Sequence, residues 1–115
     1  MLHGNKKKQL SREKNQRNAL IRTLAVSLIR DSKITTTEIK AKVLKSYIEK
    51  IITIGKEETL NAQRLIASKV GALSAKKVVK EISPKYKTRN GGYTRVIKVK
   101  TRLSDGAKMA QIEFI

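Results

Sequence analysis

Residues 91–100 read GGYTRVIKVK, and here the apolar side chains stop recurring at a helical spacing and begin to alternate. A two-residue period is typical of a β-strand, and paired glycines before it are typical of a tight turn. Val96 interrupts the otherwise polar positions of the alternation. The residues expected to share one face are Tyr93, Arg95, Ile97 and Val99. The pattern predicts a strand over 93–101 that is entered from a glycine turn.

A second alternation predicts the partner of this strand. Ala110, Ile112 and Phe114 recur at every second position, and Ser104-Asp105-Gly106 supplies turn-forming residues between the two segments. We therefore expect 93–101 and 109–114 to form a hairpin. An isolated hairpin is only marginally stable, so a third strand is expected to join it, with helices covering one face. The β-branched run at 34–37 is the candidate.

Upstream of the hairpin the apolar period is helical. A first helix over about 12–30 is expected to begin after Ser11, since serine caps helices well, and to bury a stripe that includes Leu24. The next helix is signalled by Thr35-x-x-Glu38 or by Thr37 as a direct cap. Gly55 is expected to end this helix in the left-handed conformation.

Two shorter helices are predicted before the glycine turn. One, over about 58–69, is expected to bury Leu60, Leu65 and Ile66 and to stop near Gly71. The other, over 75–82, is expected to be capped by Ser74, to bury Val78, Val79 and Ile82, and to be ended by Ser83-Pro84. The fold class is therefore α+β, a two-layer α/β arrangement in the order helix-strand-helix-helix-helix-strand-strand with a small three-stranded sheet. Residues 1–10 form a basic N-terminal extension, and 11–115 a single α/β domain.

The charge of the chain indicates a polyanionic partner. Its 115 residues carry 27 Lys plus Arg against 9 Asp plus Glu, a net charge of +18. Release of counterions from phosphates drives the binding of such a protein to nucleic acid. The basic residues concentrate in the first 17 positions and in 82–104, a segment without acids.

The residue inventory argues against an enzyme. The chain has no cysteine, and its one histidine, His3, lies in the extension, so we expect no catalytic residues, no metal and no cofactor. Without catalytic residues, no small-molecule substrate is expected either. No apolar run reaches the ~18 residues of a membrane span. A membrane-surface protein is disfavoured, because interfacial tryptophan is absent.

The kind of nucleic acid can be narrowed further. Aromatic residues make up only 3% of the chain, which disfavours a protein that binds single strands by stacking on their bases. Tyr93 has two alternative roles, either stacking on one base or covering the edge of the sheet. Cations on a rigid body suit recognition of folded RNA by its shape and backbone. The alternative is a free nucleoid-type or regulatory DNA-binding module. Gly91 and Gly92 either adopt a tight turn or leave backbone amides open to a phosphate.

Several segments, in order along the whole chain, resemble the bacterial-type large-subunit ribosomal protein seventeen family. The string Gly91-Gly92-Tyr93-Thr94-Arg95-Val96 is the most specific of them. The others are Met1-Leu2-His3, Gln9-Leu10-Ser11-Arg12, Thr36-Thr37, Lys40-Ala41-Lys42, Ile52-Thr53 with Lys56, and Met109-Ala110-Gln111-Ile112-Glu113-Phe114. The chain departs from the family at Leu2, where a basic residue is common, and at Lys98 and Lys100.

The resemblance implies a structural role in the cytoplasmic ribosome, without catalysis. The expected partners are large-subunit ribosomal RNA, near the peptide exit region, and neighbouring large-subunit ribosomal proteins. The residues predicted to bind RNA are His3, Lys6, Lys7, Lys8, Arg12, Lys14, Arg17, Arg22, Lys40, Lys42, Lys87, Arg89, Gly91, Gly92, Tyr93 and Arg95.

Overall fold

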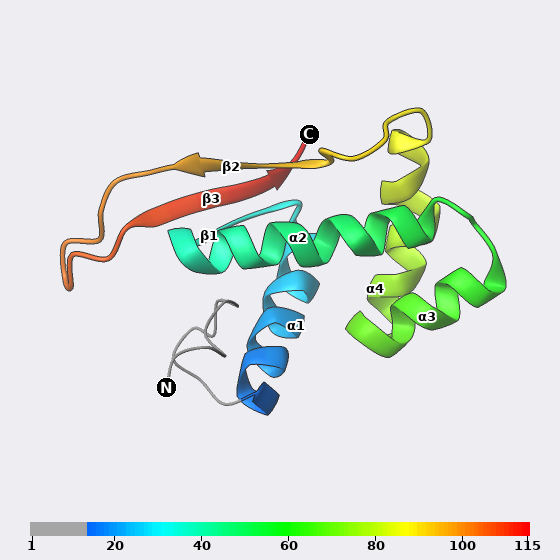
Figure 1. The fold of residues 1–115 in the computed structure, drawn as a ribbon, viewed down its shortest axis with the longest axis horizontal. Helices are drawn as coiled ribbons and strands as arrows, with labels where there is room; N and C mark the ends of the chain where they lie inside the picture. Colours follow the sequence, from blue (N-terminus) through cyan, green and yellow to red (C-terminus); the bar gives the residue numbers. More distant parts are fainter. Residues whose placement is uncertain (1–13) are drawn as a thin grey trace, which may run out of the picture.

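The computed structural model describes residues 14–115, which fold as helices packed on a small sheet (Figure 1). The predicted order of helices and strands is confirmed. Its elements are α1 (Lys14–Asp31), β1 (Lys33–Thr37), α2 (Glu38–Gly55), α3 (Leu60–Val70), α4 (Ala72–Lys77), β2 (Thr94–Lys98) and β3 (Met109–Phe114). The predicted helix start at Ser11 lies outside the described residues.

The three strands form one sheet, as predicted from the two alternations and the β-branched run. The sheet is antiparallel, in the order β1-β3-β2. The last strand in the chain is therefore the central one. Ile112 pairs with Ile34 on one side and with Val96 on the other, so these three side chains share a face. Ala110 and Ile112 are fully buried on that face, which packs against the helices.

The predicted face of β2 is wrong. Ile97 and Val99 remain 42% and 40% exposed, whereas Thr94 and Val96 face the helices. The register explains this, because Thr94 and Val96 pair with Phe114 and Ile112, whose side chains point to the helical layer. Alternation divides a strand into two faces, but only the partner strand decides which face is buried.

Gly55 does not have the predicted left-handed conformation. It is the last residue of α2 and is buried. The turns that contain Val78 and Ser83 approach it closely. A Cβ placed on it would lie 2.5 Å from Ser83 Oγ and 3.0 Å from Val78 Cγ1. The start of α2 at Glu38 leaves Thr37 at the cap position, but its side chain makes no capping bond. The Glu38 amide instead donates to the carbonyl of Lys108, at 2.9 Å.

The boundaries and buried residues of the two short helices also differ from expectation. The predicted burial of Ile66 is confirmed, but Leu60 and Leu65 are 61% and 49% exposed. Ala62 and Val70 are buried in their place. Since a 58–69 helix has several possible apolar faces, the face was decided by packing.

The fourth helix begins directly after Gly71, at φ 90°, and not after Ser74. Beyond Lys77 the chain continues through a π-helical turn over Val78–Ile82 and a 3-10 turn over Ser83–Tyr86. The predicted burial of Val78, Val79 and Ile82 is confirmed.

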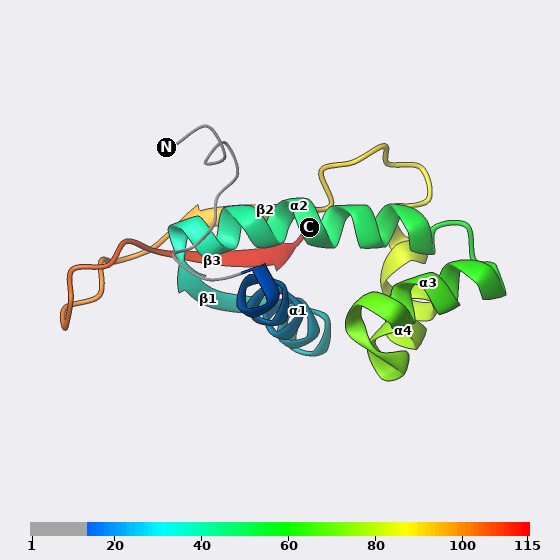
Figure 2. The same ribbon diagram turned by 60° about the horizontal axis from the view of Figure 1, so that its bottom comes forward.

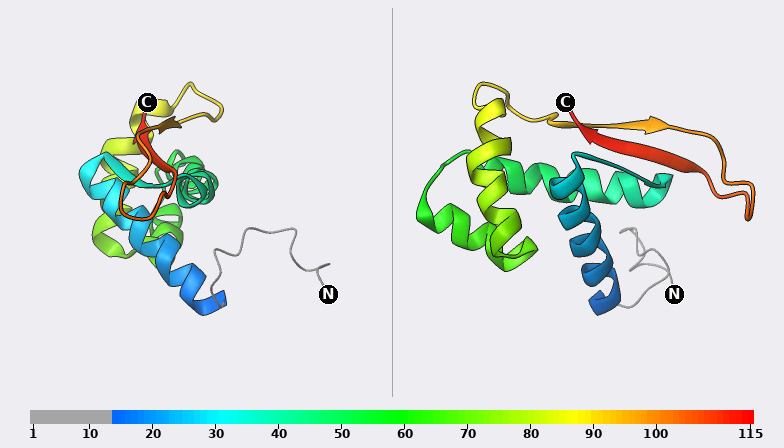
Figure 3. Two further views of the ribbon diagram at one scale, coloured as in Figure 1. Left: turned by 90° about the vertical axis from the view of Figure 1, so that its left-hand side faces the viewer. Right: turned by 180° about the vertical axis from the view of Figure 1, so that it is seen from behind.

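α2 is the central element of the molecule. Leu44, Ile48 and Ile52 on this helix are fully buried, and the core around them is almost entirely aliphatic. The sheet and α1 pack on its N-terminal half, while α3 and α4 gather at its C-terminal end (Figures 1 and 2). The loop that joins β2 to β3 extends beyond the start of α2, as seen from both sides of the molecule (Figure 3).

Candidate nucleic-acid interface

A basic groove runs between α1, α2 and the end of α3. It encloses about 620 Å³, and among the described residues, 14–115, no acidic side chain lines it. We call it the first groove. The cations that line it are Lys14, Arg17, Arg22, Lys50 and Lys69, with Asn18, Ile21, Val43, Ser46, Tyr47 and Ser68 between them.

Tyr47 holds the walls of the first groove together. Its hydroxyl donates to the Lys69 carbonyl, at 3.3 Å, which ties α2 to the last turn of α3. Burial raises the Tyr47 pKa, although the charge of Arg22 opposes the shift. Tyr47 therefore stays neutral, and the groove keeps its full positive charge.

A second groove lies on the other side of the same helix, between α2 and the glycine turn. Lys50 and Ser46 line both grooves, so the two form one surface along α2. The remaining lining residues of this second groove are Glu49, Thr53, Ile54, Gly91 and Tyr93. The structure thus brings α1 and the glycine turn, which are far apart in the sequence, to one surface.

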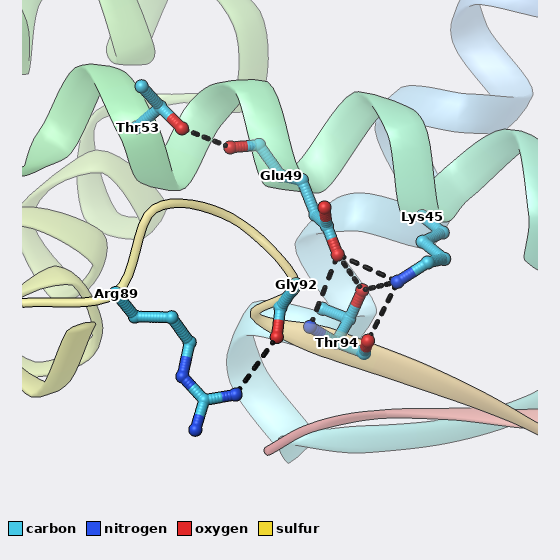
Figure 4. Close-up of polar contacts among 6 residues, drawn as sticks. All are labelled: Lys45, Glu49, Thr53, Arg89, Gly92 and Thr94. Atoms are coloured by element: carbon cyan, nitrogen blue, oxygen red, sulfur yellow. Dashed lines mark hydrogen bonds and ion pairs between the residues drawn. The ribbon is translucent and has the colours of Figure 1, made fainter.

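The glycine turn has an open backbone. Gly91 and Gly92 both have positive φ, 118° and 65°, and a Cβ on either would meet no atom within 4 Å. Arg89 Nη1 donates to the Gly92 carbonyl, at 3.3 Å, across the turn (Figure 4). Among the residues that the structure describes, neither glycine amide has a hydrogen-bond acceptor.

Lys56 holds this turn from behind. Its ammonium group donates to the Arg89 carbonyl and to the Tyr93 hydroxyl, the latter at 3.1 Å, and lies 5.2 Å from the centre of the Tyr93 ring. Hydrogen bonds that the Tyr93 oxygen accepts from Thr53 and Lys56 lower the pKa of Tyr93. Lys56 therefore stabilises the conformation of the glycine turn.

Tyr93 cannot stack on a base in this conformation. Its ring is only 2% exposed and packs against Tyr86, with 5.2 Å between the ring centres. Of the two roles considered for Tyr93, the base-stacking role is wrong, because the ring belongs to the core.

A polar network fixes the first residue of β2 to α2 (Figure 4). The Glu49 carboxylate accepts hydrogen bonds from the Thr94 hydroxyl at 2.9 Å, the Thr94 amide at 3.3 Å and the Lys45 ammonium group at 2.8 Å. Lys45 also donates to the Thr94 carbonyl, at 2.8 Å. Glu49, the one acid of the second groove, is therefore neutralised where the glycine turn enters the strand.

The other predicted residues are not all on this surface. Lys40 precedes Val43 and Tyr47 by one and two helical turns, so it lies on the side of α2 that faces the first groove. Lys42 lies about 160° from Lys40 around the helix axis. Its ammonium group pairs with the Glu38 carboxylate, at 3.1 Å. Lys87 pairs with Glu58, and Arg95 with Glu113 on the outward face of the sheet. His3, Lys6, Lys7, Lys8 and Arg12 lie outside the described residues.

Sequence reasoning missed Lys50 and Lys69, and did not assign Lys56 to the site. Lys50 is four residues after Ser46 on the exposed side of α2. A helical wheel of the predicted helix would therefore have placed Lys50 on the same exposed side as Ser46. Lys69 had no such signal, because its place depends on how α3 packs.

Residues 14–115 contain neither a membrane-spanning helix nor a cluster of metal ligands. No helix in this range combines the length and apolar character needed to cross a membrane. The same range contains no cluster of three or more His, Cys, Asp or Glu side chains able to hold a metal ion.

Comparison with known proteins gives one family. The family model described as ribosomal protein L17 matches residues 20–115. A protein of Pelagibacter ubique named large ribosomal subunit protein bL17 is 48% identical over all of this chain and 80% of its own length. Proteins of the same name from Sulfurihydrogenibium and Campylobacter concisus are 46% and 44% identical, over 97% and 98% of their lengths.

Proposed function

The chain belongs to the ribosomal protein L17 family, and from this premise we propose that it is a structural component of the large ribosomal subunit that binds folded ribosomal RNA along α2. Its role is non-enzymatic, and its partners are ribosomal RNA and neighbouring proteins of that subunit. The place of action is the ribosome of the cytoplasm. The relatives give no support to the DNA-binding alternative.

The observation that carries the RNA interface is the acid-free lining of the first groove. Arg22, Lys50 and Lys69 form no ion pair within residues 14–115, and no carboxylate of that range lines the groove. Cations held on rigid helices lose little freedom when they meet a phosphate backbone. Their mutual repulsion in the free protein is relieved when phosphates enter the groove.

The glycine turn supplies a second kind of contact. The amides of Gly91 and Gly92 lack acceptors, and exposed successive amides in such turns bind anions. We assign one phosphate to this turn, with Arg89 and Lys50 on either side. The first groove and the turn would then bind consecutive parts of one RNA backbone.

The test removes two cations of the first groove and measures RNA binding. Arg22→Ala with Lys50→Ala should weaken binding to large-subunit ribosomal RNA and lower the slope of log K against log salt by about 1.4–1.8, since each lost phosphate contact contributes about 0.7–0.9. The unmodified protein should co-sediment with large subunits in high-salt gradients.

The matched control is Lys76→Ala with Lys80→Ala. It removes the same charge from exposed positions on α4 and the π-helical turn, away from both grooves. If both double variants change the salt slope equally, binding depends on net charge alone and the proposed interface is wrong. A parent protein that stays at the top of the gradient and binds duplex DNA would exclude the ribosomal role.

A further inference from the structure

The outward face of the sheet is uncharged toward the hairpin loop and carries three apolar side chains, Ile97, Val99 and Met109. The register groups its side chains into rows that cross the three strands. The first row is charged, with Lys33, Glu113 and Arg95. The next two rows contain no charge and consist of Thr35, Gln111 and Ile97, then Thr37, Met109 and Val99.

Large apolar side chains on this face remain exposed to solvent. Ile97 and Val99 are 42% and 40% exposed, and Met109 lies beside Val99. Exposed large apolar side chains that gather at one place are typical of an interaction site.

The loop beyond these rows is shaped to present another apolar side chain. Leu103 is fully exposed in the loop between β2 and β3. This loop extends past the N-terminal end of α2 (Figure 3). Arg102 and Asp105 form a two-pronged ion pair across the turn, with 2.9 and 2.8 Å between donors and acceptors. The Gly106 amide donates to the Arg102 carbonyl, at 2.8 Å, so the turn is closed at its base.

The charges around this surface indicate the chemistry of the partner. Lys100 and Lys108 flank the apolar rows, and neither forms an ion pair within residues 14–115. Resting on the ribosomal role above, we propose that the outward face of the hairpin docks a neighbouring large-subunit protein through an apolar segment with acidic residues at its edges. An apolar centre with a charged rim is the usual anatomy of a protein interface.

RNA fits this surface less well. The two uncharged rows offer only Gln111 and the threonines as hydrogen-bond donors, and they contain no aromatic ring for a base to stack on. Arg102, the guanidinium nearest the tip, is already paired with Asp105. Phosphate contacts require cations within the surface, and these two rows contain none.

A photo-crosslink in assembled subunits tests the proposal. The full chain with Ile97→p-benzoylphenylalanine is expressed in a bacterium, the large subunits are isolated on a gradient, and they are irradiated. The expected product migrates more slowly in a gel, survives ribonuclease and is lost with protease. Mass spectrometry should place the adduct on an apolar segment of another large-subunit protein beside Asp or Glu. The same substitution at Lys80 reports the background.

Charge reversal gives the second measurement. Lys100→Glu with Lys108→Glu should abolish the Ile97 adduct, while Lys76→Glu with Lys80→Glu, an equal change of charge elsewhere, should leave it. An adduct with RNA or with a second copy of this chain, no adduct above background, or an adduct that survives the reversal would each overturn the proposal. A chain that does not sediment with large subunits would overturn the ribosomal role as well, so the two failures are distinguishable.

Discussion

Replacing Glu49 with alanine tests whether the network at the start of β2 stabilises the fold. The carboxylate accepts from the amide and the hydroxyl of Thr94, a residue that is only 2% exposed. Glu49→Ala leaves both donors buried without an acceptor. Each such donor costs about 1–3 kcal/mol. Loss of the half-exposed ion pair with Lys45 adds little to the change in the free energy of unfolding, because solvent screens the pair.

The two donors together give a loss of about 2–6 kcal/mol in the free energy of unfolding. For a chain of this length, roughly 4 °C of melting temperature is lost for each kcal/mol, so Glu49→Ala should melt about 8–24 °C below the parent. Thermal unfolding followed by circular dichroism measures the difference. A melting temperature within about 2 °C of the parent would refute the reasoning, since it would show that water satisfies Thr94 in the native state.

The isosteric variant Glu49→Gln separates charge from shape. Burial raises the Glu49 pKa, but the hydrogen bonds from Lys45 and Thr94 together outweigh it and hold the pKa below its ordinary 4.5. A depressed carboxyl pKa stabilises the fold above about pH 4.5 and loses that contribution as the pH falls. The melting-temperature difference between the parent and Glu49→Gln should therefore narrow below pH 4.5. A constant difference down to acid pH would contradict the assigned pKa direction.

Three further outcomes are expected. Gly55→Ala should lower the free energy of unfolding by about 1–3 kcal/mol in chemical denaturation, because its Cβ meets Ser83 Oγ, and adding Ser83→Ala should recover part of the loss. Arg95→Ala should change that free energy by no more than about 0.5–1 kcal/mol, because its pair with Glu113 is exposed, and should leave the RNA salt slope unchanged, because that pair lies on the outward face of the sheet; a slope lowered by about one would place Arg95 in the RNA interface. Deleting residues 1–10 should leave the melting temperature nearly unchanged while weakening RNA binding, and a large drop in melting temperature would show that they pack on the core.

The sequence predicted what depends on local periodicity. The change from a helical to a two-residue period correctly located β2 and β3, and the β-branched run correctly located β1. These signals come from the chain's own geometry, so they survive any packing arrangement.

The errors occur where a distant segment decides the outcome. Ile97 faces outward because β3 sets the register, and Gly55 is small because Ser83 crosses α2 there. Tyr93 is buried because Tyr86 and Lys56 reach it from other elements. For the same reason the composition predicted a basic interface, but only the packing of α1, α2 and α3 placed Lys50 and Lys69 in one groove.

The central position of β3 has a consequence for the order of synthesis. Neither β1 nor β2 pairs with the other, and both pair with β3. The ribosome synthesises β1 early and must continue through Phe114 before either edge strand has a partner. The α3–α4 pair, in contrast, is close in sequence and can form while translation continues. During that interval the apolar undersides of β1 and α2 have no sheet to cover them, so chains interrupted before Met109 are expected to aggregate.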